Sequence, residues 1–267
     1  MWRFLYFDEL DGYYSAALFE SIGKHVGSGL APETILFWRV ASPVVYLGYH
    51  QCVKDEIHDV FCRENNIGII RRILGGGCGF CDRDQILFSV IGKEGNIIPD
   101  DIQDAYNKVL MGVVFALSTL GQNGQIDQER NAVYTNGRKI SGNAQGRFDD
   151  VVLVNGSLLL DFDFELMDKV LKNPAKNLKS VVQAKKGMIT LKDVGITEID
   201  RIKIALRKGF ELTLGINSED GALTRSELDM TERLLAKYSN KEWTYRMDIK
   251  RALRKKIEKC GQILNNP

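Results

Sequence analysis

Two short segments of this sequence carry residues whose types and spacing suit chemistry on phosphate or carboxylate groups. The first is a run of glycines, Gly75-Gly76-Gly77 with Gly79, which follows a predicted strand over 68–73. Adjacent glycines expose consecutive backbone N–H groups and let a ligand approach the chain closely, and phosphate oxygens often bind such a nest. The loop has neither a dinucleotide fingerprint nor a Gly-Lys-Ser/Thr sequence, so the glycines alone also fit an ordinary turn.

The second segment is a lysine strand over residues 136–145, with the sequence NGRKISGNAQ. Strand alternation predicts that Lys139 and Ser141 share one face, and the missing side chain at Gly142 leaves room for a ligand beside the lysine. Considered alone, the same stretch fits an exposed strand lysine.

Arg71 and Arg72 immediately precede the glycine run. Alternation along a strand places neighbouring side chains on opposite faces. We therefore expect only one of the two arginines to point towards a ligand.

Together, these segments resemble those of the lipoate–protein ligase A family, from about residue 7 to residue 243. The most specific stretches are RRILGGG at 71–77, GRKISGNAQ at 137–145 and NGSLLL at 155–160. Weaker stretches agree with the family in their order: FWR at 37–39, LGYHQ at 47–51, VVQAKKGMITL at 181–191, KYS at 237–239 and EW at 242–243. The resemblance implies an α/β fold with a mixed α+β sheet, the biotin/lipoate protein ligase catalytic-domain fold, which is like that of class II aminoacyl-tRNA synthetases.

The resemblance also implies an activity. Family members activate lipoate with ATP to lipoyl-adenylate and then transfer the lipoyl group to a lysine of an acceptor domain. The acceptor would be the E2 lipoyl domain of a 2-oxoacid dehydrogenase or a glycine-cleavage H protein, and Mg²⁺ would accompany the ATP. Lys139 matches the family's catalytic lysine, whose charge offsets the repulsion between a carboxylate and a polyphosphate. Arg72 matches the arginine that binds the acyl-adenylate.

The same resemblance assigns the residues that bind the nucleotide and the acyl group. They are Arg72, Gly75, Gly76, Gly77, Cys78, Gly79, Phe80, Asp82, Lys139, Ser141, Gly142 and Ala144. No metal ligands are predicted. An apolar tunnel for the lipoyl tail would be lined by strand residues such as Trp38, Val45 and Leu47.

Four positions depart from the family pattern. They are Cys81, Gln85, Ala132 and Asn155, where relatives usually carry His, Asn, Asp and His. The change at Ala132 removes a carboxylate that would help to hold a metal or orient an amine. These departures weigh against ATP-driven ligation more than against binding of an adenylate.

Two alternatives stay open. The first is an octanoyl or lipoyl transferase of the same fold that does not activate its substrate with ATP. Related transferases use a cysteine nucleophile before or after the lysine hairpin, yet residues 121–130 contain no cysteine and none occurs between Lys139 and Cys260, which disfavours a thioester intermediate. A protein that only uses preformed lipoyl-adenylate is a variant of this alternative. The second is a non-catalytic relative that binds a lipoyl domain or a partner subunit.

The composition limits the class of protein. The chain has 267 residues, 44% hydrophobic and 27% charged, with a formal net charge of +1, which fits a soluble globular protein and disfavours a nucleic-acid or membrane partner. The five cysteines are an odd number and do not suggest a disulfide framework. The pair Cys78 and Cys81 lacks the further ligands of a zinc site.

The sequence shows no signal peptide and no long apolar run. We therefore expect a cytoplasmic protein.

Periodicity predicts the elements that must position these residues. Helices are expected over 13–27, 53–66, 101–119, 164–171, 198–214, 224–239 and 248–260. Strands are expected over 34–40, 43–47, 68–73, 85–91, 131–135, 138–144 and 151–160. The pair Asn136-Gly137 favours a hairpin, Thr224 with Glu227 fits a capping box, and 121–125 is a predicted loop.

We expect residues 1–245 to form the catalytic domain and 246–267 a basic helical tail. The tail is too short for a further domain, so a separate accessory subunit would supply any lid over the adenylate. Three apolar residues spaced by four are expected to dock the tail helix: Ile249, Leu253 and Ile257.

Overall fold

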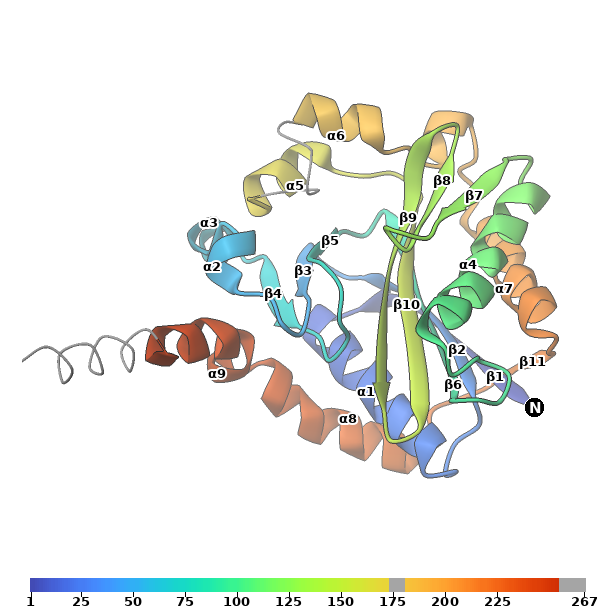
Figure 1. The fold of residues 1–267 in the computed structure, drawn as a ribbon, viewed down its shortest axis with the longest axis horizontal. Helices are drawn as coiled ribbons and strands as arrows, with labels where there is room; N and C mark the ends of the chain where they lie inside the picture. The colour runs from blue at the N-terminus through green and yellow to red at the C-terminus, as the bar shows by residue number, and fades with distance from the viewer. Residues whose placement is uncertain (173–180, 255–267) are drawn as a thin grey trace, which may run out of the picture.

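The protein is built around an eight-stranded mixed sheet, seen in a computed structural model that describes residues 1–172 and 181–254 (Figure 1). The strand order is β11-β1-β2-β6-β10-β9-β8-β7. The strands are β1 (Trp2–Leu10), β2 (Thr34–Val40), β6 (Gln85–Lys93), β7 (Gly124–Asp127), β8 (Ala132–Thr135), β9 (Arg138–Phe148), β10 (Val151–Leu159) and β11 (Ser218–Asp220). β1 pairs in parallel with β11 and β2, and the pairings from β2 to β7 are antiparallel. The predicted mixed α/β class is confirmed.

A second sheet of three strands, in the order β4-β3-β5, carries the glycine run. Its strands are β3 (Val44–Leu47), β4 (Gly68–Arg71) and β5 (Gly79–Cys81). Alternate residues of β3 belong to different cores: Val44 and Tyr46 pack with α1 and the large sheet, whereas Val45 and Leu47 pack with α2 and α5. This sheet is therefore buried on both faces, and the loop between β4 and β5 is held against the large sheet.

Helices cover both faces of the large sheet. α4 (Ile102–Thr119) and α7 (Ile199–Leu214) pack together on one face, while α1 (Gly12–Gly27) and α8 (Arg225–Tyr238) lie on the other (Figure 1). The remaining helices are α2 (Val53–Glu56), α3 (Asp59–Glu64), α5 (Phe164–Val170), α6 (Val181–Gly187), the 3₁₀ helix η1 (Lys192–Val194) and α9 (Lys241–Thr244). In the part of the chain that the structure describes, no helix is both long enough and apolar enough to cross a membrane.

The predicted capping box at the start of α8 is confirmed. The Thr224 hydroxyl accepts from the Glu227 amide at 3.2 Å, and Glu227 accepts from the Thr224 amide at 2.7 Å. Glu227 is fully buried and also pairs with Arg3 of β1 at 2.5 Å. One carboxylate thus caps a helix and ties it to the first strand.

The predicted helix over 53–66 is two helices, because tertiary pairing interrupts it. Ile57 forms a β-bridge with Leu171, and the amide of His58 donates to the carbonyl of Val170 at 2.9 Å. The prediction of one helix is therefore wrong. The loop predicted over 121–125 is also partly wrong, because it includes the beginning of β7.

The tail contacts the protein through polar groups. The chain is helical over 246–254, but Ile249 is 44% exposed and Leu253 is 54% exposed. Asp248 instead accepts hydrogen bonds from the amides of Val53 and Lys54 at 2.9 and 3.1 Å. The predicted apolar docking is wrong for the described part of the tail, and Ile257 lies outside the described residues.

Candidate functional site

The lysine strand is the second strand of a tight hairpin. β8 ends at Thr135 and β9 begins at Arg138, and the two residues between them, Asn136 and Gly137, have φ angles of 51° and 70°. Two positive φ values match a hairpin turn whose twist suits the flanking strands. The predicted hairpin is confirmed, and it sets the point where the chain enters β9.

A β-bulge follows at once. Tyr134 pairs with Lys139, whereas Val133 pairs with Ser141, so Ile140 is an additional residue on β9. A bulge of this kind changes the alternation of side chains along the strand. Lys139 and Ser141 consequently lie on opposite faces, and the prediction that they share a face is wrong.

The ammonium group of Lys139 lies over Gly142. Nζ is 2.9 Å from the position that a Cβ at residue 142 would occupy, so the missing side chain makes room for the lysine. The main chain of Lys139 is fixed as well, because its carbonyl accepts from the Ile189 amide at 2.9 Å. The lysine is thus positioned by a bulge, a glycine and a backbone hydrogen bond.

The electrostatic surroundings of Lys139 are mixed. Burial lowers the pKa of Lys139, the Asp127 carboxylate on β7 opposes that shift, and Arg130 adds to it. Asp127 accepts from Arg130 Nη1 at 2.6 Å, and this hydrogen bond is the main reason that the pKa of Asp127 lies below its ordinary value. Asp127 is therefore a carboxylate anion near the lysine.

The face of the sheet that carries Lys139 continues through residues with small side chains. Gly142 and Ala144 follow on β9, and Ala144 is paired with Asn155 of β10. Asn155 is paired in turn with Ser89, whose hydroxyl donates to the Asn155 side-chain oxygen at 2.6 Å. Two of the predicted ligand residues, Gly142 and Ala144, therefore share a face with the lysine.

Arg72 shapes the glycine loop from within. Its Nη2 donates to the carbonyls of Gly75 and Gly77, both at 2.7 Å, and its Nη1 donates to the carbonyl of Tyr46 at 2.8 Å. Its Nε is buried and has no hydrogen-bond partner within the described residues. Arg72 therefore places a cation directly behind the loop.

The loop is held between two surfaces. The Gly75 amide donates to the carbonyl of Gln145 at 3.0 Å, which docks the loop on β9. Gly76 has a φ of 82°, and a Cβ at Gly48 would lie 2.1 Å from its carbonyl oxygen. A Cβ at Gly76 would itself be 3.5 Å from that of Ala144. Glycine at position 48 is thus required by the close approach of the Gly76 backbone, and glycine at position 76 is favoured by its positive φ.

The crest of the loop is open, while the residues after it support it. A Cβ at Gly77 or Gly79 would meet nothing within 4 Å. Phe80 is buried in the small sheet, and Asp82 is buried while accepting from the amide of Asp163 at 3.1 Å. Burial raises the pKa of Asp82. Of these predicted residues, the two glycines are the ones whose surroundings leave space for a ligand.

Cys78 and Cys81, at the end of the glycine loop and in β5, ionise less readily than a free thiol. Burial raises the pKa of Cys78 and that of Cys81, to about 12 for Cys81. A thiol that stays protonated is a poor nucleophile and a poor metal ligand. Within residues 1–172 and 181–254, no group of three or more His, Cys, Asp and Glu side chains is arranged to hold a metal ion.

Arg71 has a different task from Arg72. It is fully buried, and it donates to the carbonyls of Gly48, Tyr49 and Thr244, at 2.6 Å for the last. The two arginines bind separate sets of carbonyls, as strand alternation predicts. Arg71 links the small sheet to the C-terminal helices, whereas Arg72 binds the carbonyls of the glycine loop.

The predicted tunnel residues do not line one cavity. Trp38 is 2% exposed and packs in the core beneath α1, whereas Val45 and Leu47 are fully buried in the separate core formed with α2 and α5. The prediction of a shared tunnel is wrong, because alternation on β3 sends these residues into another layer.

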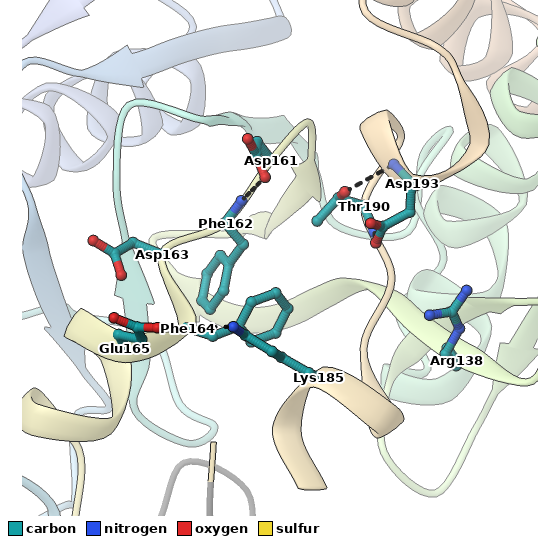
Figure 2. Close-up of a pocket in the computed structure, with 9 residues that line it drawn as sticks. All are labelled: Arg138, Asp161, Phe162, Asp163, Phe164, Glu165, Lys185, Thr190 and Asp193. Atoms are coloured by element: carbon teal, nitrogen blue, oxygen red, sulfur yellow. Dashed lines mark hydrogen bonds and ion pairs between the residues drawn. The ribbon is translucent and has the colours of Figure 1, made fainter. Parts of the chain in front are cut away.

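A polar cavity of about 520 Å³ lies where β10 ends, near the beginning of β9 (Figure 2). It is lined by Arg138, Asp161, Phe162, Asp163, Phe164, Glu165, Lys185, Thr190 and Asp193. Its carboxylates already have partners: Asp161 pairs with Lys192, and Asp193 accepts from the Thr190 amide. None of the predicted ligand residues lines this cavity.

Sequence reasoning missed Asp127 and Arg130. Both fall in the segment between α4 and the lysine hairpin, and the short strand β7 brings Asp127 beside that hairpin. That pairing is tertiary and is not visible in the residue pattern.

The family model described as the lipoyl protein ligase A/B catalytic domain matches residues 11–211. The octanoyltransferase LipM of Geobacillus kaustophilus is 29% identical to this chain, over 92% of the chain and 98% of that protein. The octanoyltransferase LipM of Clostridioides difficile is also 29% identical, over 91% and 97%. That of Bacillus subtilis is 26% identical, over 92% and 98%.

Solved structures show the same fold. A lipoate-protein ligase A bound with ATP superposes with a TM-score of 0.81 at 24% identity, covering 92% of this chain and 100% of that one. A bi-partite lipoate protein ligase from Thermoplasma acidophilum, described with its E2 lipoyl domain, has a TM-score of 0.81 at 25% identity, covering 92% and 97%. The predicted fold and the resemblance to the lipoate ligase family are confirmed.

The predicted activity needs correction. The three curated relatives named above, which match over nearly their whole length, are octanoyltransferases rather than ligases. The prediction of an ATP-dependent lipoate–protein ligase is therefore wrong, and the first alternative, a transferase of the same fold, is the better supported. Lys139 and the glycine loop did not distinguish the two, because both activities bind the same kind of acyl group.

Proposed function

Because this chain belongs to the lipoyl protein ligase A/B catalytic domain family, we propose that it is an acyltransferase that moves an octanoyl or lipoyl group from an activated carrier to a lysine of an acceptor domain. The observation that carries this proposal is the placement of Lys139, whose Nζ lies over Gly142 on the face that also receives the glycine loop. The proposal gives no role to ATP, to Mg²⁺ or to an accessory subunit.

The chemistry suits the groups present. The acceptor amine attacks the acyl carbonyl carbon of a thioester donor, an N–C bond forms, the C–S bond breaks, and the proton lost by nitrogen leaves with the thiol. Negative charge develops on the carbonyl oxygen in the transition state. A preorganised ammonium at that point stabilises the charge, and Lys139 is the group that we assign to this task.

The donor would bind across the glycine loop. Gly77 and Gly79 leave the crest of the loop open, and Arg72 places a cation behind its carbonyls. A phosphate-bearing carrier arm, such as a phosphopantetheine thioester, has the negative charge and the slender shape that this loop favours.

We infer that the acyl group passes directly to the acceptor amine, without an acyl-cysteine. The strands β7, β8, β9 and β10, which surround Lys139, contain no cysteine. Burial raises the pKa of Cys62 to about 11 and that of Cys81 to about 12, and it also raises the pKa of Cys78. Thiols in this state are poor nucleophiles.

The acceptor is proposed to be a lipoyl domain. The support is the archaeal neighbour, whose structure was described with its E2 lipoyl domain. We expect the target lysine of such a domain to reach the face of the sheet that carries Lys139.

The test is transfer from an octanoyl thioester of acyl carrier protein to an apo lipoyl domain, followed by intact mass. Wild-type protein should add one octanoyl group without ATP, Lys139→Ala should lose this activity, and Lys208→Ala, an exposed lysine on α7, should keep it. Replacing all five cysteines by serine should also leave transfer intact. Transfer that needs ATP and the free acid would overturn the proposal, and binding without any transfer would instead favour a non-catalytic relative.

A further inference from the structure

A row of residues crosses four strands beside the catalytic lysine. Asp127 of β7 is paired with Ala132 of β8, Ala132 with Gly142 of β9, and Gly142 with Ser157 of β10. Directly opposed residues of antiparallel strands project from the same face. Asp127 therefore shares a face with Gly142, and Lys139 extends its ammonium over that glycine.

The middle of this row is almost free of side chains. Ala132 contributes one methyl group and Gly142 contributes none, so no bulky group separates the Asp127 carboxylate from the lysine. Two strand spacings separate the backbones at Asp127 and Gly142, which is about 10 Å. The Lys139 ammonium lies over Gly142, at the β9 end of the row, and therefore on the same face as the Asp127 side chain, two strands away.

The carboxylate of Asp127 is oriented within its own loop. It accepts from Arg130 Nη1 at 2.6 Å and from the Arg130 amide at 3.1 Å, while Arg130 itself is exposed. Burial lowers the pKa of Lys139, and Asp127 is the main group that opposes this shift. The chain thus provides a fixed anion for a partly buried cation.

Other charged groups around the lysine do not replace Asp127. Arg138 precedes Lys139 on β9, and Lys185 and Lys186 lie on α6, which packs on that strand; all three carry positive charge. Lys185 is 4.0 Å from Glu165, which lines the separate polar cavity of Figure 2. Glu129, next to Arg130, is exposed to solvent.

We propose that Asp127 is a positioning residue of the acyl-transfer site, whose carboxylate attracts the Lys139 ammonium and orients it over Gly142. This inference rests on the proposed function only for its effect on catalysis. The arrangement of Asp127, Ala132 and Gly142 is a property of the fold, and it is measurable without substrate.

The first test measures the ionisation of Lys139 directly. Reductive methylation with ¹³C-formaldehyde labels Lys139, its signal is assigned with Lys139→Arg, and its titration is followed by NMR. Asp127→Asn should move the titration of Lys139 to lower pH, whereas Glu129→Gln should leave it in place. An unchanged titration in Asp127→Asn would overturn the inference whether or not the protein transfers acyl groups.

The second test measures the kinetics of acyl transfer. Asp127→Asn should lower kcat about tenfold with little change in KM for the donor, and should shift the alkaline limb of the kcat profile to lower pH. Asp127→Glu, which keeps the charge, should recover most of both. A loss in Asp127→Glu equal to that in Asp127→Asn, with both proteins folded, would contradict a charge-based role.

A third variant moves the carboxylate along the row. Because Ala132 lies directly opposite Asp127 on the same face, the double variant Asp127→Asn/Ala132→Asp should return the titration of Lys139 towards that of the wild type. If this variant does not fold, the titration of Lys139 in Asp127→Glu is compared with that in Asp127→Asn instead. If Asp127→Asn lowers the titration pH of Lys139 as expected but the wild type transfers no acyl group, the proposed function is refuted. The pairing of Asp127 with Lys139 is then still supported.

Discussion

The Nζ of Lys139 lies 2.9 Å from the position that a Cβ at Gly142 would occupy. Gly142→Ala should therefore displace the ammonium, and kcat for acyl transfer should fall roughly 10- to 100-fold, since a shift of about 1 Å in a catalytic group costs up to this much. Steady-state kinetics on the folded variant would show it. Ser118→Ala, at an exposed position on α4 away from the site, is the control. Equal losses in both variants would argue against a specific contact.

Arg130 should act on the lysine in the direction opposite to Asp127. Its charge adds to the lowering of the Lys139 pKa, so Arg130→Gln should raise that pKa. Activity needs the charged lysine, and it is lost as pH rises through the Lys139 pKa. The alkaline limb of the kcat profile should therefore move to higher pH in this variant, and a shift to lower pH would contradict the assignment.

Arg72 and Arg71 should differ in what they control. Arg72→Ala leaves the carbonyls of Gly75 and Gly77 without their donor, so we expect a loosened loop and a KM for the acyl donor raised about tenfold or more. Arg71→Ala should instead lower the free energy of unfolding by about 2–4 kcal/mol, because it removes a fully buried donor to several carbonyls. Denaturant titration and donor KM, measured on both variants, separate the two effects.

The buried pair of Arg3 and Glu227 should make stability depend on acid pH. Burial alone would raise the pKa of Glu227, but hydrogen bonds from Arg3 and from the Thr224 amide, with the Arg3 charge, bring the pKa below its ordinary value. This contribution is present above the unfolded-state pKa of about 4.3 and is lost as pH falls through the lower folded-state value. Glu227→Gln should cost about 3–5 kcal/mol near neutral pH and should flatten the acid side of the stability profile.

Two long elements were predictable because their patterns repeat, whereas the nine-residue strand β1 was not predicted. The helix over 101–119 and the strand over 151–160 match α4 and β10 within two residues at each end, since each buries a continuous apolar face. The three-residue strands β5 and β11 are too short for a pattern, and they form only because a distant partner pairs with them.

Within the site, residue identity was more predictable than orientation. The resemblance selected Lys139, Arg72 and the glycines, and the structure places the Gly75 amide on the β9 carbonyl of Gln145. The bulge at Ile140 reversed the expected position of Ser141, because a one-residue change of register depends on the partner strand. Asp127 escaped notice for the same reason, since only pairing between strands brings it to the lysine.

Residues of α8 and α9 complete the support of β1 and β4, and this affects how the protein folds during synthesis. Arg3 near the N-terminus finds its anion in Glu227, and Arg71 finds an acceptor in the carbonyl of Thr244. A ribosome-bound chain lacks these two partners until residues 227 and 244 have been synthesised, so Arg3 and Arg71 make these contacts late. The segment that carries the glycine loop should consequently gain full protection from proteases only after residue 244 has been synthesised, and a stall in translation before that residue would leave it exposed.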